Sequence, residues 1–124
     1  MVHAAISELT MLRWDLAREA DCVVRHGFNS ISLWRAKLSD IGAEAARSLL
    51  QQAGLGVLSL QWAGGFTGSD GRSFSEAVDD AVEAVDVAAE VGADVLVVHS
   101  GCRGGHTRGH ARRLLADALD IIAP

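Results

Sequence analysis

The feature that most constrains this chain is a short pattern that occurs three times. Each copy is an amphipathic segment, a glycine, and a short apolar segment that ends in an aromatic or polar residue. The copies span residues 25–34, 52–62 and 90–99, with the glycines at Gly27, Gly54 and Gly92. Glycine adopts the left-handed conformation that ends an α-helix, so each glycine marks a helix end just before a strand. Repeated short helix-to-strand connections predict an α/β fold with parallel strands.

Eight elements follow from this pattern and from the spacing of apolar residues. Asp40 is the expected N-cap of the second helix, and Ser73 with Glu76 forms an S-x-x-E capping box at the start of the third. The expected inner faces include Val24 on the first helix and Ile41 on the second. The predicted strands are 4–8, 30–33, 56–60 and 94–98, and the predicted helices are 15–26, 40–53, 73–91 and 111–122.

Composition limits the class of protein. The chain has 124 residues, 49% of them hydrophobic, which is enough for one core. No apolar run approaches the roughly 20 residues of a membrane span, and the N-terminus lacks the basic and apolar regions of a signal peptide. Cys22 and Cys102 are isolated in the sequence and predict free thiols in a reducing cytoplasm. A net charge of −5 argues against nucleic acid as a partner.

Polar and aromatic side chains stand where the predicted strands end. The carboxyl ends of parallel strands share one edge of a sheet, and binding sites form there. Tryptophan rings at this edge offer flat apolar faces to a sugar or a base. They equally suit a structural role, in which they pack over the end of the hydrophobic core. His99 suits either a binding or a structural role. The strand-end candidates are Glu8, Trp34, Gln61, Trp62 and His99.

Two long glycine-rich loops, residues 63–72 and 100–109, each follow a predicted strand. Neither matches G-x-x-x-x-G-K-[ST] or G-x-G-x-x-G, which disfavours a nucleotide cofactor. The second loop offers the spacing H-x2-C-x3-H-x3-H, but its glycines leave those side chains unpositioned for a metal. A basic cluster around this loop could instead hold an anion, or be ordinary surface. It comprises Arg103, Arg108, Arg112 and Arg113 with His106 and His110.

These segments resemble a known family, the xylose isomerase-like TIM barrels, or sugar phosphate isomerases/epimerases. Residues 92–101, 103–113 and 114–119 are similar to the fourth β/α unit of that family, residues 27–34 to its second strand, and 53–60 to its third. The resemblance implies four consecutive β/α units, half of a (β/α)8 barrel, in a single incomplete domain over residues 1–124.

The resemblance also implies an activity. Barrels of this family shift a proton on a sugar or polyol, which can be phosphorylated, and hold a divalent metal (Mn, Mg, Co or Zn) mainly through strands five to eight. A full barrel takes roughly 250 residues. The chain therefore reads as an N-terminal fragment that holds no metal firmly and is inactive alone, with catalytic residues unassigned. The pocket lining that the resemblance implies is Glu8, Trp34, Gln61, His99 and His106.

Several alternatives stay open. In the endonuclease-IV-type branch of the family a histidine at the end of strand four binds metal, and His99 stands at that place, so an apurinic endonuclease is a rival. A second rival is a non-catalytic half-barrel, two copies of which close an eight-stranded ring. Unpaired strand edges and an apolar sheet face predict that the isolated chain self-associates. A third is an open flavodoxin-like sheet with a reversed strand order.

Overall fold

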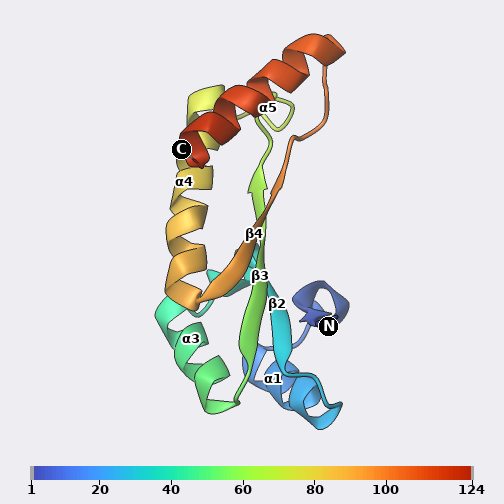
Figure 1. Cartoon of the computed structure of the whole chain (residues 1–124), viewed down its shortest axis with the longest axis vertical. Coiled ribbons are helices and arrows are strands. Elements are labelled where there is room, and N and C mark those ends of the chain that lie inside the picture. Colours follow the sequence, from blue (N-terminus) through green and yellow to red (C-terminus); the bar gives the residue numbers. More distant parts are fainter. Residues whose placement is uncertain (1, 124) are drawn as a thin grey trace. The chain divides into compact units, whose positions relative to one another are not determined.

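The computed structural model describes residues 2–123 and shows strands alternating with helices along the chain (Figure 1). β2 (Ser30–Trp34) and β3 (Gly56–Gly64) extend beyond the predicted strands 30–33 and 56–60, so Gln61 and Trp62 lie within β3 and not after its end. The elements in order are β1 (Ile6–Ser7), a 3-10 helix η1 (Glu8–Met11), α1 (Leu16–Arg25), β2 (Ser30–Trp34), α2 (Arg35–Leu38), α3 (Ala43–Gln52), β3 (Gly56–Gly64), α4 (Phe74–Val91), β4 (Ala93–His99) and α5 (Arg108–Ile122).

The described strands form one four-stranded parallel sheet in the order β1-β2-β3-β4. Ile6 of β1 is opposite Ile31 of β2, and Trp34 at the end of β2 is opposite Gln61 of β3. A sequential order is that of consecutive β/α units in a barrel, whereas a doubly wound open sheet reverses its order. The arrangement is thus that of a partial TIM barrel, as the sequence predicted.

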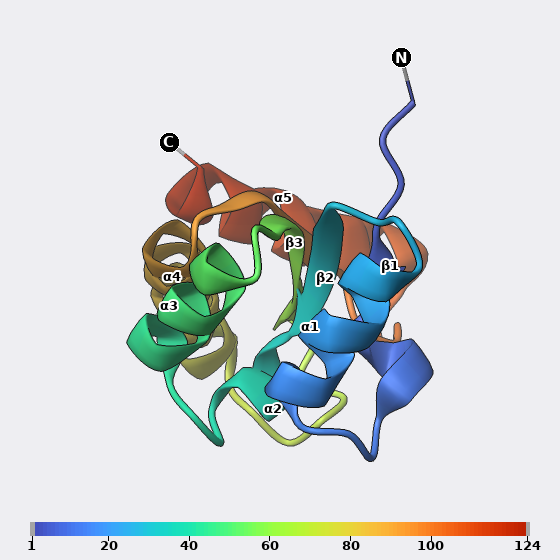
Figure 2. The same ribbon diagram turned by 90° about the horizontal axis from the view of Figure 1, so that it is seen from below.

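The chain divides into two compact units. The first unit comprises residues 2–61 and 87–97, and the second comprises 62–86 and 98–123. In the first unit, α1 and α3 lie over β2 and β3 (Figure 2) and bury a core of aliphatic side chains, among them Ala20, Ile31, Leu33, Leu50 and Leu60. That the whole chain is one incomplete domain stays a prediction.

The repeated glycines end their helices as expected. Gly27, Gly54 and Gly92 have φ values of +81°, +72° and +76°. After α1, the Gly27 and Phe28 amides donate to the carbonyls of Val24 and Val23. This pair of bonds is the Schellman motif, which satisfies the last carbonyls of a helix.

The predicted second helix, residues 40–53, is wrong in its start. The chain forms the short α2 directly after β2 and begins α3 at Ala43, with Gly42 as N-cap in place of Asp40. Gly42 has a φ of +84°, which no residue inside a helix adopts, so the two helices are separate. Ile41 lies in this break and is 44% exposed, instead of facing the core.

Two further expectations differ in detail. Val24 is 44% exposed, and the inner face of α1 carries Glu19 in addition to Leu16, Ala20 and Val23. The continuous apolar run of residues 94–98 is typical of a parallel strand covered on both faces, but β4 is an outer strand of this sheet and Val95 is 51% exposed. An outer strand keeps one row of unpaired backbone N–H and C=O groups, with which another strand can pair.

Candidate functional site

Three charged side chains meet inside the first unit, and we call them the acid–lysine cluster: Glu8, Glu19 and Lys37. Glu8 is 2% exposed and Glu19 is fully buried. Lys37, which is the only lysine in the chain, forms an ion pair with Glu19 and lies 3.8 Å from Glu8 Oε2 through its Nζ. Its ammonium also donates to the carbonyl of Met11 at 3.1 Å.

Local structure positions each member of the cluster. Glu8 opens η1, where the Ser7 hydroxyl accepts a hydrogen bond from the Leu9 amide at 3.2 Å. Glu19 lies in the first turn of α1, whose N-cap Asp15 accepts from the Arg18 amide at 2.8 Å. Lys37 lies on α2, which begins as soon as β2 ends. The cluster therefore joins three segments at the carboxyl ends of β1 and β2.

The cluster has one cation for two carboxylates. Burial, followed by the charge of Glu19, raises the pKa of Glu8 from its ordinary value of 4.5 to about 7, against the opposing effects of Lys37 and the Trp34 backbone. Burial also raises the pKa of Glu19, although Lys37 opposes it. Oε2 of each glutamate has no hydrogen-bond partner among the described residues. Two buried carboxylates beside one ammonium are a site that takes up a proton near neutral pH.

This arrangement predicts a stability that falls as pH rises from 5 to 8. Folded Glu8 holds its proton more tightly than unfolded Glu8, so the folded state loses this advantage as pH rises through about 7. We expect a decrease of about 3 kcal/mol in the free energy of unfolding. Urea unfolding over a pH series measures it. Glu8→Gln should reduce the slope, whereas Glu83→Gln on the exposed face of α4 should keep it, and equal slopes in both variants would contradict the assignment.

Two cavities border the cluster in the first unit. Glu8 and Lys37 line a cavity of about 100 Å³ together with Trp14. Lys37 also lines a more open cavity of about 510 Å³ with Trp14 and Trp34. Trp34 is half-buried and is paired in register with the half-buried Gln61. The structure thus brings Trp34 close to Glu8 and places Gln61 beside Trp34.

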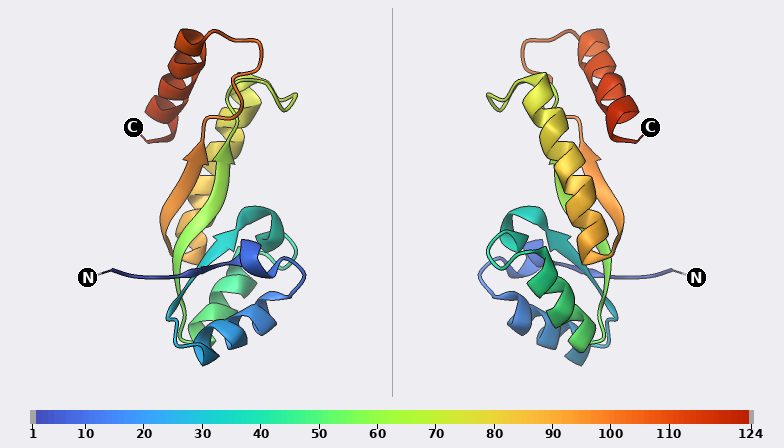
Figure 3. Two further views of the ribbon diagram at one scale, coloured as in Figure 1. Left: turned by 90° about the vertical axis from the view of Figure 1, so that its right-hand side faces the viewer. Right: turned by 90° about the vertical axis from the view of Figure 1, so that its left-hand side faces the viewer.

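In the second unit, two loops lie against each other (Figure 3). The amides of Gly65 and Phe66 donate to the carbonyls of His99 and Ser100, both at 3.1 Å. The Thr67 hydroxyl donates to the Cys102 carbonyl at 2.5 Å. These bonds extend the pairing of the strands into the loops, so the glycine-rich loops are held in place rather than left as free connections.

The remaining predicted site residues lie in this second unit. Trp62 is 40% exposed on β3, and His99 ends β4 as an exposed residue. His106 is half-buried, and its Nε2 donates to the Thr67 carbonyl at 2.7 Å. Its ring lies 4.8 Å from the ring of His110, centroid to centroid. His106 therefore has a positioning contact with the first loop.

Three of the six residues of the basic cluster line a cavity of about 410 Å³. Arg103, Arg108 and Arg112 line it with Thr67 and Ser100, and none of the described residues that line it is acidic. The first turn of α5 contains no acidic residue. Thr107 caps this helix, because its hydroxyl oxygen accepts a hydrogen bond from the His110 amide at 3.2 Å. A cavity of this size with three guanidinium groups suits an anionic group such as a phosphate.

The donor set fits a metal ion poorly. Among residues 2–123 there is no group of three histidine, cysteine or acidic side chains that could hold one. In the H-x2-C-x3-H-x3-H stretch, His106 is hydrogen-bonded to a backbone carbonyl and packs against His110, while Cys102 is exposed. A lone His99 offers one ligand.

Sequence reasoning missed Glu19 and Lys37. A usable signal existed for Glu19, because residue 19 lies three after Leu16 and four before Val23 and so shares their helix face. Lys37 was detectable only as the one lysine of the chain, just after a strand-end tryptophan. Its partner Glu8 was predicted as the last residue of strand 4–8, whereas in the structure it directly follows β1 as the first residue of η1.

Fold and site define a parallel β/α half-barrel with polar, aromatic and basic side chains after its strands. The model of the xylose isomerase-like TIM barrel family matches residues 20–124. The chain belongs to that family. No helix in the described part of the chain is long and apolar enough to cross a membrane.

Solved structures agree with this assignment. Protein SMc04130 from Sinorhizobium meliloti 1021 is 32% identical with a TM-score of 0.85, over 97% of this chain and 45% of that one. A xylose isomerase-like TIM barrel/4-hydroxyphenylpyruvate dioxygenase fusion protein is 20% identical with a TM-score of 0.75, over 95% of this chain and 19% of that one. An AP endonuclease, family 2, from Brucella melitensis is 18% identical with a TM-score of 0.76, over 99% of this chain and 50% of that one. No curated protein matches significantly.

Proposed function

We propose that the chain supplies the N-terminal half of a barrel that isomerises or epimerises a sugar or polyol. The observation that carries the proposal is the family match over residues 20–124 together with the aromatic and polar side chains in the C-terminal parts of β2, β3 and β4. The chain spans about half the length of two of the barrels it resembles, 45% and 50%. The activity is thus a property of the completed barrel.

In this proposal both units carry candidate binding residues. In the first unit, Trp34 gives an apolar face to the sugar, Gln61 gives hydrogen bonds, and Glu8 holds the Lys37 ammonium at the cavity that Trp34 lines. In the second unit, Trp62 and His99 have the corresponding roles. Aromatic faces and a few placed polar groups are the usual means of binding a sugar ring.

The basic cavity favours a phosphorylated substrate. Arg103, Arg108 and Arg112 line it without an acidic neighbour, and His106 holds the adjoining loop to Thr67. Arginine binds phosphate through paired N–H donors, which fix orientation as well as charge. A divalent metal would polarise the sugar oxygen in such a barrel, and its ligands would come from residues outside this chain, because the donor set described here fits one poorly.

The test is a chimera in which this chain is joined to the second half of the Sinorhizobium meliloti relative. We expect it to catalyse exchange of a carbon-bound proton of a ketose, aldose or polyol for solvent deuterium when Mn, Mg, Co or Zn ions are supplied, and we expect the 124-residue chain alone to be inactive. Proton NMR in D2O measures the exchange. Activity of the chain alone with metal would contradict the proposal.

Variants of the chimera test the assigned residues. His99→Ala and His106→Ala should weaken turnover or substrate binding, and Arg103→Gln should weaken binding of phosphorylated substrates more than unphosphorylated ones. Glu83→Ala, on the exposed face of α4, is the matched control and should leave turnover unchanged. A chimera indifferent to both histidine changes would refute the assigned pocket.

The same chimera tests the rival function. The apurinic endonuclease alternative rests on His99 at the end of β4 and on the fold shared with the Brucella melitensis protein. A net charge of −5 disfavours a DNA partner. We therefore propose that the chain binds neither nucleic acid nor a membrane. We also propose a cytoplasmic location, because free cysteines such as Cys22 and Cys102 are stable in that reducing compartment. Cleavage of an apurinic oligonucleotide without any sugar exchange would favour the rival.

A further inference from the structure

The smaller of the two cavities beside the acid–lysine cluster has an acidic lining that the proposed chemistry does not use. Its volume is about 100 Å³, and it lies wholly within the first unit. Trp14 contributes an aromatic ring to its wall. The charged residues that line it are three acids and one lysine, Glu8, Asp15, Asp40 and Lys37, and the remaining lining residues are aliphatic. The cavity therefore combines a surplus of negative charge with apolar and aromatic walls.

The carboxylate of Glu8 is a second, independent indication of a ligand at this cavity. Glu8 is 2% exposed, and its Oε2 atom has no hydrogen-bond partner among residues 2–123. The Lys37 ammonium lies 3.8 Å from this oxygen, which is too far for a hydrogen bond. It donates to the Met11 carbonyl at 3.1 Å instead and forms its close ion pair with Glu19. Because buried carboxylate oxygens in folded proteins are normally hydrogen-bonded, Glu8 lacks a donor.

The charges of the cluster indicate that the missing donor is a cation. Glu8 and Glu19 are two buried carboxylates, and Lys37 is their one cation. Burial, followed by the charge of Glu19, raises the pKa of Glu8 to about 7, so near neutral pH a proton supplies the missing positive charge. A metal ion is not suited, because no group of three histidine, cysteine or acidic side chains among residues 2–123 could hold one. An ammonium group offers a positive charge together with three N–H donors.

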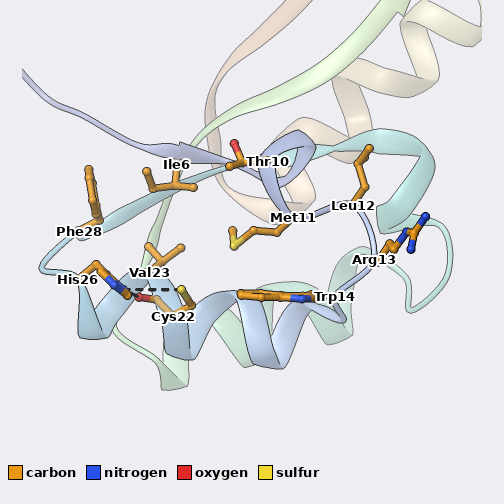
Figure 4. Close-up of a pocket in the computed structure, with 10 residues that line it drawn as sticks. All are labelled: Ile6, Thr10, Met11, Leu12, Arg13, Trp14, Cys22, Val23, His26 and Phe28. Atoms are coloured by element: carbon orange, nitrogen blue, oxygen red, sulfur yellow. Dashed lines mark hydrogen bonds between the residues drawn. The ribbon is translucent and has the colours of Figure 1, made fainter.

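Trp14 lies where this acidic cavity can be compared with an apolar one. Its ring also lines a cavity of about 580 Å³ together with Met11 and Val23 (Figure 4), and none of the described residues that line that larger cavity is acidic. The Arg18 guanidinium carbon lies 4.2 Å from the centroid of the Trp14 ring, so this ring already attracts a cation. A neutral apolar molecule should therefore prefer the larger cavity, whereas a small organic cation should prefer the acidic one.

We propose that the acidic cavity binds the ammonium group of a small primary amine, with the Glu8 carboxylate as the acceptor of its N–H groups. Asp15 and Asp40 add negative charge to the site, and Trp14 adds an aromatic wall. The bound ammonium takes the place of the proton that Glu8 holds near neutral pH, so that the two carboxylates of the cluster have two cations. The inference needs only the first unit, so it does not rest on the proposed function.

The test is a titration of the chain with ethylammonium chloride, followed by amide NMR. The signals of Glu8 and Lys37 should move. Because the amine and the proton compete for Glu8, binding should be about tenfold or more weaker at pH 5.5 than at pH 8. Ethanol, a neutral hydroxyl donor of similar shape, and potassium chloride, a simple cation, should leave these signals in place. Equal shifts with either probe, or an affinity that does not change with pH, would overturn the proposal.

Three variants locate the bound amine. Glu8→Gln keeps the shape of the side chain and should abolish the ethylammonium shifts. The matched control is Glu44→Gln on the exposed face of α3, which should bind as the wild type does at both pH values. Asp40→Asn should weaken binding about two- to fivefold and keep its pH dependence, and it decides the matter if Glu8→Gln fails to fold. Wild-type affinity in Asp40→Asn, or in a folded Glu8→Gln, would place the amine elsewhere and overturn the proposal.

Discussion

Replacing Lys37 with methionine is expected to destabilise the first unit strongly. Lys37 is the only cation of the acid–lysine cluster, and both glutamates are almost fully buried. Methionine keeps much of the apolar stem but leaves two buried carboxylates without their ion-pair partner. Removing one member of a buried ion pair costs about 3–5 kcal/mol. Urea unfolding at pH 8 measures this loss, since low pH would protonate the glutamates.

The matched comparison removes the charges together. The triple variant Glu8→Gln/Glu19→Gln/Lys37→Met has no buried charge in the cluster and should recover most of the lost stability, because neutral groups of similar volume tolerate burial. The stability of Lys37→Met should also improve as the pH is lowered from 8 to 5, as the two carboxylates take up protons. A Lys37→Met variant as stable as the wild type at pH 8 would show that the ion pairs contribute little.

The acid–lysine cluster, which affects stability, lies next to the candidate site of the first unit. Glu8 follows β1 and Lys37 follows β2, so the charges gather where strands end and where the proposed pocket lies. A sequence optimised for stability alone would replace such a buried cluster with apolar side chains. The cluster lies beside the cavity that Lys37 and Trp34 line, which is where the proposed pocket of the first unit is located.

Much of the fold was predictable because its signals are local. Gly27 and Gly54 end their helices with positive φ values, and Ser73 and Glu76 form the reciprocal bonds of the capping box at 2.7 and 3.1 Å. Such bonds join residues only three positions apart, so spacing reveals them. The sequential strand order followed from the repeat in the same way.

The misses arise where a local rule had a competitor. Asp40 is a good N-cap by type, but Gly42 two residues later has a positive φ and moves the start of α3 to Ala43. Val24 is more apolar than Glu19, yet residue 19 faces the core and Val24 does not. The buried place of Glu19 depends on Lys37, which lies 18 residues further along the chain. Only the tertiary structure brings such a pair together.

Replacing Gly64 with alanine is expected to break the strand-end packing of the second unit. A Cβ at Gly64 would lie 1.9 Å from the carbonyl oxygen of His99 and 2.9 Å from its carbon, which is far inside any real contact. These are backbone atoms, so no side chain can rotate away. Gly64 also has a φ of +127°, which disfavours alanine. We expect a loss of more than about 3 kcal/mol in the free energy of unfolding.

Gly71→Ala separates the two causes of that loss. Gly71 belongs to the same unit and has a φ of +87°, but nothing lies within 4 Å of its added Cβ. It should therefore lose only the conformational cost of about 1–2 kcal/mol. Chemical unfolding measures both variants, and amide NMR spectra show whether the His99 and Ser100 signals shift in Gly64→Ala alone. Equal losses in the two variants would mean that backbone conformation, and not the approach of Gly64 to His99, makes glycine necessary. A larger loss in Gly64→Ala would instead show that glycine is required so that the end of β3 can lie against the residue that ends β4, which is the residue the proposed pocket uses.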